Sequence, residues 1–142
     1  MTSTMTVELV SPERVLFSGE ATMVVTRTLG GGDIAFQPGH AAFLAALVEN
    51  HTRIYLADGT VQDVAVHGGF VQVANNKVSI LSDLAELGPQ IDVTRAQRAK
   101  ERADALLATG ADVNAEAALR RAHARIAAAG NVAAAGSARA AH

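Results

Sequence analysis

The sequence predicts a protein of the β + α class, with an N-terminal antiparallel β-sandwich of eight to ten strands and a C-terminal antiparallel two-helix hairpin. Two observations predict this division. Residues 91–142 contain 20 alanines and no aromatic residue, whereas residues 1–90 contain 10 alanines and all five aromatic residues. The formal charge changes from −5 in the first part to +3 in the second. We therefore expect a β-sandwich over 1–88, a helical hairpin over 89–130 and a flexible tail over 131–142.

Short runs rich in β-branched residues extend from Thr6 to Ser82. Apolar and polar residues alternate in them, as in Val71-Gln72-Val73, and this period of two is typical of strands with one dry and one wet face. Glycine and asparagine pairs of the kind that form tight turns separate the runs, which indicates a sandwich or a flattened barrel. The predicted strands are Thr6–Val10, Arg14–Phe17, Thr22–Thr28, Asp33–Phe36, Arg53–Ala57, Val61–His67, Phe70–Ala74 and Lys77–Leu81.

The sheet region ends at Gly88-Pro89, and the first helix follows. Asp92 has a side chain that can accept hydrogen bonds from the free amides of a helix N-terminus, so we predict a helix from about Val93 to Ala108. Gly110 then stops it. Its apolar stripe is Ala96, Ala99, Ala103, Leu106 and Leu107.

The second helix should begin after a short link, with Asp112 or Asn114 as its N-cap, and continue to about Ala129. A link this short makes the two helices antiparallel neighbours. Alanine-rich stripes bury little area, so we expect the hairpin to need docking or a ligand to stay folded. Residues 131–142 have two glycines and no periodic apolar face, and we interpret them as a frayed tail.

Composition excludes several classes of site. The chain has no cysteine, so it forms neither a disulfide nor a thiolate metal site. The five histidines are scattered without the spacing of metal ligands, and no serine, histidine and carboxylate are placed as a triad, so we expect no metal and no catalytic site. No basic and apolar leader precedes the first strand, and no run of ~20 apolar residues could span a bilayer.

Arginines on the two predicted helices form the clearest candidate site. Arg95, Arg98 and Arg102 lie on one flank of the first helix, and Arg121 and Arg125 lie on the equivalent flank of the second. In an antiparallel pair these guanidinium groups should converge, and guanidinium groups bind phosphate oxygens bidentately. The alternative is a solvated helix face whose charge the nearby carboxylates offset. Periodicity alone leaves both readings open.

Motifs in order along the chain resemble the epsilon subunit of bacterial F-type ATP synthases. The matching segments are Val7-Glu-Leu-Val-Ser-Pro-Glu, Leu16-Phe-Ser-Gly, Gly32-Asp-Ile-Ala-Phe-Gln-Pro-Gly-His, Gly68-Gly-Phe-Val-Gln-Val, Val78-Ser-Ile-Leu-Ser-Asp and Ile91-Asp-Val-Thr-Arg-Ala. The resemblance implies a β-sandwich that binds the gamma subunit and the membrane ring of c subunits. It also implies a hairpin that either lies on the sandwich or extends toward the catalytic head, where it hinders ATP hydrolysis.

The resemblance also implies two sets of site residues. Asp33 and His40 match the part of the sandwich that faces the c-ring, although His40 could instead be an ordinary hydrogen-bonded turn histidine. In some members the hairpin binds ATP through an Ile/Leu-Asp-x-x-Arg-Ala motif, which makes ATP a possible regulatory ligand here. The candidate ATP-binding residues are Glu86, Ile91, Asp92, Arg95, Ala96, Arg102, Arg121 and Arg125.

The expected function is that of a non-catalytic central-stalk subunit, peripheral at the cytoplasmic face of the cell membrane, that couples proton translocation to ATP synthesis and regulates ATP hydrolysis. Its partners would be the gamma subunit, the c-ring and the alpha and beta subunits of the head, with no nucleic acid. Arg120, Arg121 and Arg125 have a competing use, because an extended hairpin would carry them toward acidic surfaces of the head. The alternative is a stand-alone sandwich module that binds a nucleotide or another small molecule beneath a helical lid.

Overall fold

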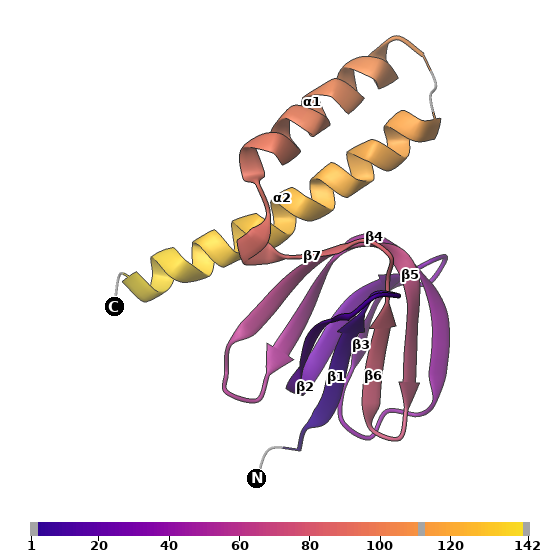
Figure 1. The fold of residues 1–142 in the computed structure, drawn as a ribbon, viewed down its shortest axis with the longest axis vertical. Helices are drawn as coiled ribbons and strands as arrows, with labels where there is room; N and C mark the ends of the chain where they lie inside the picture. The colour runs from indigo at the N-terminus through magenta and orange to yellow at the C-terminus, as the bar shows by residue number, and fades with distance from the viewer. Residues whose placement is uncertain (1–2, 111–112, 141–142) are drawn as a thin grey trace.

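The computed structural model describes residues 3–110 and 113–140, and the side chains within 3–110 and 114–130. A β-domain is followed by two helices that lie across one end of it (Figure 1). This confirms the predicted fold class. The strands are β1 (Met5–Val10), β2 (Val15–Thr28), β3 (Gly32–Phe36), β4 (Phe43–Leu56), β5 (Val61–Ala74), β6 (Lys77–Leu81) and β7 (Ala85–Leu87).

The described residues form seven strands, fewer than the eight to ten predicted, because three of the strands are 14 residues long. Strand β5 joins the two segments that we predicted as Val61–His67 and Phe70–Ala74. The side that is buried changes along it, from Val64 and Val66 to Val71 and Val73. Gly68 and Gly69, with φ of 89° and 110°, lie at the change. A glycine kink of this kind turns the strand over without ending its pairing.

Strand β4 shows the same change, and it explains why we predicted only its last part. Its buried positions pass from Leu47 to Asn50, Thr52 and Ile54. A polar buried residue in mid-strand hides the alternation on which the prediction depends. Thr52 donates to Asn50 at 2.7 Å and Asn50 donates to the carbonyl of Val48 at 2.8 Å, so these buried polar groups are satisfied.

The sheet closes on itself. The order is β1-β6-β5-β4-β2-β3, and β1 also pairs with β2, while β7 pairs with β5. All of these pairings are antiparallel except β1 with β6, which is parallel and departs from the fully antiparallel sheet that we predicted. Closure removes most free edges and encloses one apolar core. The largest fully buried side chains in it are Phe36, Met5, Leu9, Ile54 and Ile80.

The hairpin begins after a 3-10 turn at Gly88–Gln90. Helix α1 (Val93–Ala108) has the predicted bounds, and the Asp92 side chain accepts from the backbone N–H of Arg95, as predicted for its cap. Helix α2 (Val113–Ala140) begins one residue before Asn114, so Asn114 is not its N-cap, and Asp112 lies outside the described residues. No helix in the described part of the chain is long and apolar enough to cross a membrane.

Helix α2 continues eleven residues beyond the end predicted near Ala129. Gly130 does not adopt a positive φ, so it does not form the left-handed cap that ends a helix, and it costs only about 1 kcal/mol relative to alanine. The neighbouring alanines have the highest helix propensity of all residues. The flexibility of residues 131–142 stays a prediction.

Helix α2 lies between α1 and the β-domain. It packs against α1 on one side and against β4, β5 and the 3-10 turn on the other (Figure 1). Ala96 and Ala103 of α1, both from the predicted stripe, are buried, as are Ala115 and Ala122 of α2. The docking that we expected the hairpin to need is therefore present in the structure.

Candidate functional site at the junction of hairpin and sandwich

The outer face of β4 and β5 carries charged and polar side chains where α2 crosses it. Strand alternation places Glu49, His51 and Arg53 of β4 on this face, and the register pairs them with His67, Ala65 and Asp63 of β5. Glu86 of β7 lies opposite Ala65. Helix α2 therefore docks on a polar surface with a small apolar centre.

That centre is a cluster of five buried residues. Ala65 is fully buried, and the other members of the cluster are Ile91, Ala124, Ala128 and Ala129. Small side chains allow the helix to approach the sheet closely, but they remove little apolar area from water, at about 25 cal/mol per Å². Polar contacts on either side of the cluster must therefore contribute to docking.

Glu86 connects the sheet to the hairpin. Its Oε1 accepts from Nε of Arg125 at 2.5 Å and from Nε2 of His67 at 3.1 Å. Burial opposes ionisation of Glu86, but the hydrogen bond and charge of Arg125 and the bond from His67 outweigh it, so the pKa of Glu86 lies below its ordinary value. We call His67, Glu86 and Arg125 the Glu86 cluster.

His67 is the most deeply buried member of the Glu86 cluster, since its side chain is 1% exposed. Burial lowers the pKa of His67 and the charge of Arg125 lowers it further, while Glu86 only partly compensates. The imidazole is therefore neutral at pH 7, with Nε2–H donating to Glu86. The buried Nδ1 of His67 has no partner among the described residues.

A second ion pair lies on the other side of the apolar centre. Nε of Arg120 donates to Glu49 at 3.1 Å. Burial opposes ionisation of Glu49, but hydrogen bonds from its own backbone N–H and from Arg120 lower its pKa. Arg121 is half-buried, and its charge lowers the pKa of both Glu49 and His67.

The Ile91-Asp92-x-x-Arg95-Ala96 motif has a structural part in this conformation. Ile91 belongs to the apolar centre, Asp92 caps α1 and Ala96 is buried. Arg95 is exposed. Three of the four motif residues thus hold the start of the hairpin in place, and Arg95 is the one whose side chain is available to a ligand.

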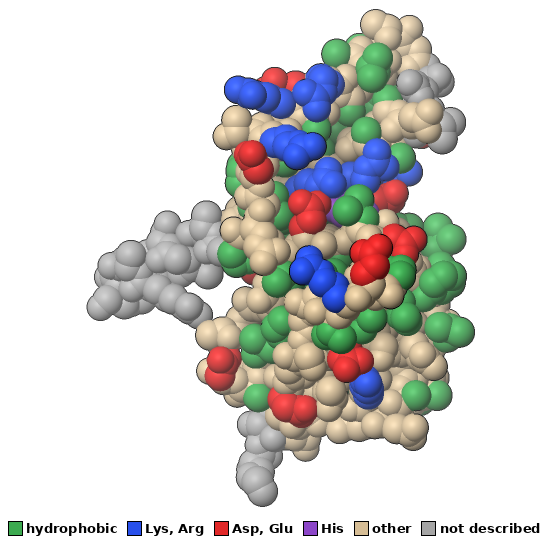
Figure 2. Space-filling model, in the orientation of Figure 1, with side chains coloured by type: hydrophobic (Ala, Val, Ile, Leu, Met, Phe, Trp, Pro, Cys, Tyr) green, Lys and Arg blue, Asp and Glu red, His purple; other side chains and the backbone are tan. Residues whose placement is uncertain are grey.

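The other predicted arginines divide into two groups. Arg98 and Arg102 are exposed like Arg95, and within the described residues the side chains of these three make no hydrogen bond or ion pair. Arg125 instead is held by Glu86, with 24% of its side chain exposed. Figure 2 shows Lys and Arg side chains of both helices gathered on one face of the hairpin, with acidic side chains just below them. The face is one on which a phosphate chain could lie.

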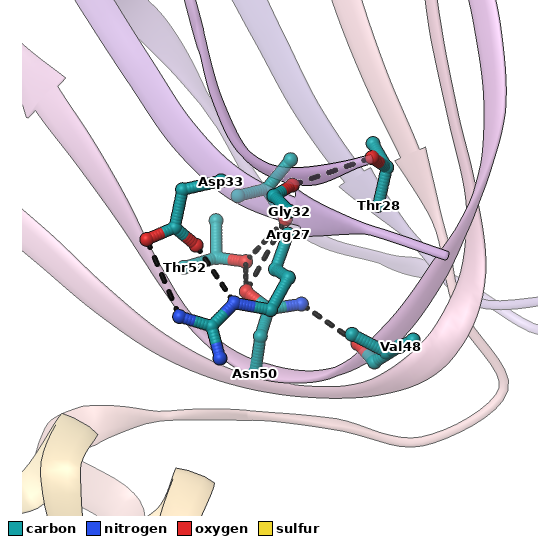
Figure 3. Close-up of polar contacts among 8 residues, drawn as sticks. Arg27, Thr28, Gly32, Asp33, Val48, Asn50 and Thr52 are labelled. Atoms are coloured by element: carbon teal, nitrogen blue, oxygen red, sulfur yellow. Dashed lines mark hydrogen bonds and ion pairs between the residues drawn. The ribbon is translucent and has the colours of Figure 1, made fainter. Parts of the chain in front are cut away.

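The two predicted c-ring residues lie toward opposite ends of β3. Asp33, near its start, forms an ion pair with Arg27 through two hydrogen bonds of 2.8 and 3.3 Å (Figure 3), and this lowers the pKa of Asp33. His40, four residues beyond its end, contacts the ring of Phe36 edge-on at 5.0 Å. Its Nδ1 lies 2.8 Å from the carbonyl oxygen of Ala41. His40 thus has the contacts of a packed turn histidine, and a c-ring contact stays a prediction for both residues.

Sequence reasoning missed the sheet side of the junction. His67 and Glu49 were not among the candidates, and Arg120 was considered only for the extended hairpin. The one available signal was the outward alternation of polar residues in β4 and β5, which does not say what covers them. Among the described residues, no group of three metal-ligating side chains gathers.

Fold and junction together define a class of protein, in which a helical hairpin is docked on the outer face of a closed β-domain. The ion pairs Arg125–Glu86 and Arg120–Glu49 and a few buried alanines hold the hairpin there. Residues 4–88 match the family model "ATP synthase, Delta/Epsilon chain, beta-sandwich domain", and residues 90–130 match "ATP synthase, Delta/Epsilon chain, long alpha-helix domain". The chain belongs to the delta/epsilon chain family of ATP synthase.

Individual relatives agree with this assignment. The ATP synthase epsilon chain of Streptomyces avermitilis is 44% identical over 125 residues, which cover 88% of this chain and all of the relative. That of Desulfitobacterium hafniense is 45% identical over 134 residues, which cover 92% and 100%. A chain in the structure of the Euglena gracilis mitochondrial ATP synthase has the same fold, with a TM-score of 0.77 at 20% identity over 88% of this chain and 81% of that one.

Proposed function

We propose that this chain is a non-catalytic subunit of the central stalk of a proton-translocating F-type ATP synthase. One observation carries the proposal: the two domains of the delta/epsilon family occur in order over residues 4–130, in a chain that spans the full length of relatives called ATP synthase epsilon chain. The stand-alone ligand-binding module is the weaker alternative, because those relatives are subunits of a complex. The subunit would be peripheral, at the cytoplasmic face of the membrane, and held there by its partners.

The proposed partners are the gamma subunit, the c-ring and the alpha and beta subunits of the head. A partner surface is available on the β-domain. Phe70 lies opposite Leu81 in the register of β5 and β6, and Leu44 lies on the neighbouring strand, with 54%, 44% and 69% of each residue exposed. Exposed apolar groups of this size that are close together are typical of protein interfaces. We assign this face to the gamma subunit.

The proposed c-ring contacts remain Asp33 and His40. Because Asp33 and His40 lie toward opposite ends of β3, a flat surface of the c-ring would contact one of these residues more closely than the other. Charge reversal of Asp33 and replacement of His40 by alanine, each tested for coupling in the reconstituted complex, would separate the two ends. Loss of coupling in neither variant would remove this contact from the proposal.

The hairpin is the proposed regulatory element. Its docking depends on the apolar centre, the Glu86 cluster and the Arg120–Glu49 pair. Each of these contributes little, so the docked and extended states can lie within a few kcal/mol. In the extended state Arg120 and Arg125 lose their ion pairs with the sandwich. Together with Arg121 they become available to acidic surfaces of the head.

ATP is the proposed ligand of the docked state. Its phosphates would lie on the arginine face of the hairpin, with Arg95 and Arg102 contributed by α1 and Arg121 and Arg125 by α2. A ligand that binds only the docked state shifts the population toward it, and cellular ATP would thus oppose the inhibitory extension. Glu86 would orient Arg125 in this site rather than bind phosphate itself.

Two experiments test these proposals separately. A pull-down with a cognate gamma subunit tests the subunit assignment, and failure to bind gamma would overturn it. Calorimetric titration of the isolated chain with ATP, with and without Mg²⁺, tests the regulatory part. We expect saturable binding that is lost in Arg95→Ala and Arg121→Ala but kept in Arg14→Ala, and no heat at millimolar ATP would leave the arginine face to the head alone.

A further inference from the structure

A groove lies between α2 and the sheet, on the flank of α2 away from the arginine face. At 100° per residue, Arg120, His123 and Ala127 lie on one flank of the helix, whereas Arg121 and Arg125 lie on the other. The groove has a volume of about 620 Å³ and is lined by the first flank. It is thus separate from the ATP site proposed above.

The walls of the groove come from both domains. Strands β2 and β4 contribute Arg27, His51 and Arg53, and α2 contributes Arg120 and His123. Two carboxylates also line it, and each is bound to one of the arginines: Asp33 to Arg27 and Glu49 to Arg120. The lining residues therefore carry one more positive than negative charge when histidine is not counted. The buried Asp63, which is hydrogen-bonded to His51 at 2.6 Å, is not part of this lining.

Arg53 is the third arginine of the lining, and the buried Asp63 lies opposite it in the register of β4 and β5. The Nε of Arg53 is buried and has no hydrogen-bond partner among the described residues. A buried guanidinium N–H without a partner is costly, about 1–3 kcal/mol, so native structures usually provide an acceptor for it. Arg53 also lines the groove, and the acceptor that best suits a guanidinium group there is an oxygen of an anion.

We infer that this groove is an oxyanion site, which takes a phosphate group that is free or carried on a small molecule. One oxygen would accept from Arg53 on the sheet, and another would accept from Arg120 or His123 on α2. The volume exceeds that of inorganic phosphate and falls within the usual range of small-molecule pockets, about 300–1,000 Å³. A small phosphorylated metabolite therefore also has room.

The site exists only when the hairpin is docked, because its two walls belong to different domains. An anion that bridges the walls therefore stabilises the docked state without occupying the arginine face. The equilibrium between docked and extended hairpin would then depend on two ligands, one bound at the arginine face and one in the groove on the other flank of α2. This inference does not require ATP to bind.

The test uses the full chain and inorganic phosphate as probe, at constant ionic strength with chloride as the replaced anion. Chemical shifts of backbone amides report binding, and hydrogen exchange of α2 amides reports docking. We expect saturable binding that Arg53→Gln and Arg120→Gln each weaken about tenfold or more, the loss of one charge-assisted hydrogen bond. A phosphorylated probe such as glycerol 3-phosphate forms a second arm, and binding of either probe with this dependence supports the site.

Two controls keep the result interpretable. Arg14→Gln removes an exposed charge that does not line the groove, and Arg121→Gln removes a half-buried charge from the other flank of α2. Both variants should bind phosphate as wild type does. Spectra of the unliganded variants show whether Arg53→Gln folds, and Arg120→Gln carries the test if it does not. Shifts no larger than those caused by chloride, or equal weakening in Arg14→Gln, would overturn the inference. So would loss of phosphate binding in Arg121→Gln alone, which would place the anion on the arginine face.

Discussion

Replacement of Glu86 by glutamine should loosen the hairpin without unfolding the β-domain. The substitution keeps the size of the side chain and removes the charge that Arg125 and His67 share. Arg125 then faces a neutral amide in a site where 24% of its own side chain and 31% of that of Glu86 are exposed. The charge pair is lost, while part of the hydrogen bonding can remain.

The degree of burial sets the size of the effect. Exposed ion pairs contribute about 0.2–1 kcal/mol, and removal of one partner from a fully buried pair costs about 3–5 kcal/mol. The Arg125–Glu86 pair is half-buried, so we take about 1–2 kcal/mol for its loss. That value corresponds to a 5–30-fold increase in the ratio of undocked to docked hairpin, by the usual ~1.4 kcal/mol for each factor of ten.

Hydrogen exchange measures this ratio directly, because undocked helices of this composition fray. Amides within residues 114–130 should exchange about 5–30 times faster in Glu86→Gln than in wild type, and amides of β6 should be unchanged. Asp104→Asn is the matched control, since it breaks the exposed Lys100–Asp104 pair within α1. A change below twofold in Glu86→Gln, or an equal change in the control, would refute the role given to the Glu86 cluster.

Three further predictions concern the β-domain, its junction with the hairpin and its partner face. Gly69→Ala should lower the free energy of unfolding by more than about 3 kcal/mol in a denaturant titration, because its φ is 110° and a Cβ there would lie 2.0 Å from a carbonyl oxygen of β6. The control Gly59→Ala, at a positive φ but in open space, should lower it by only about 1–2 kcal/mol. Equal losses in the two variants would contradict this prediction. Docking should weaken as the pH falls below about 6.5, because the pKa of His67 is lower in the folded state and folding therefore disfavours its protonation. It should weaken again below about 4.3, as Glu86, whose folded-state pKa is also lowered, becomes protonated. Hydrogen exchange of α2 amides that does not change between pH 8 and 5, after correction for the intrinsic pH dependence, would be the contrary result. Phe70→Ser should weaken binding of the gamma subunit about tenfold or more in a titration while thermal unfolding shows an intact fold, and unchanged affinity would move the gamma contact to another face.

Local signals in the sequence were sufficient for some elements. The strand Lys77–Leu81 was predicted with its observed bounds, because Asn75 and Asn76 form the turn before it and both adopt a positive φ. The helix Val93–Ala108 was also predicted with its observed bounds, because a capping aspartate and a following glycine mark its ends. In each case the residues that set the boundary are neighbours in the chain, so the physical cause lies within the segment itself.

Elements without such local boundaries were predicted less well. The pairing of β1 with β6 joins residues about 70 positions apart, and the three-residue β7 is too short to show a period. The end of α2 was placed too early because glycine was taken as a stop, although a glycine stops a helix only where the backbone turns left-handed. The resemblance supplied Glu86 as a candidate and the helix spacing supplied Arg125, but neither predicted their contact.

By itself the sequence determined the two domains, the alternation that builds the β-domain, the caps of the first helix and the family motifs, since all of these depend on residue types and their spacing. Only the tertiary structure decided which face of the sheet α2 covers, that Glu86 binds Arg125 across 39 positions, and that Arg53 meets Arg120 and His123 around one groove. Docking of α2 results from many weak contacts between distant segments, and the sequence of one segment does not show which other segment it contacts. The two sites that we propose on the flanks of α2 therefore depend on the folded chain.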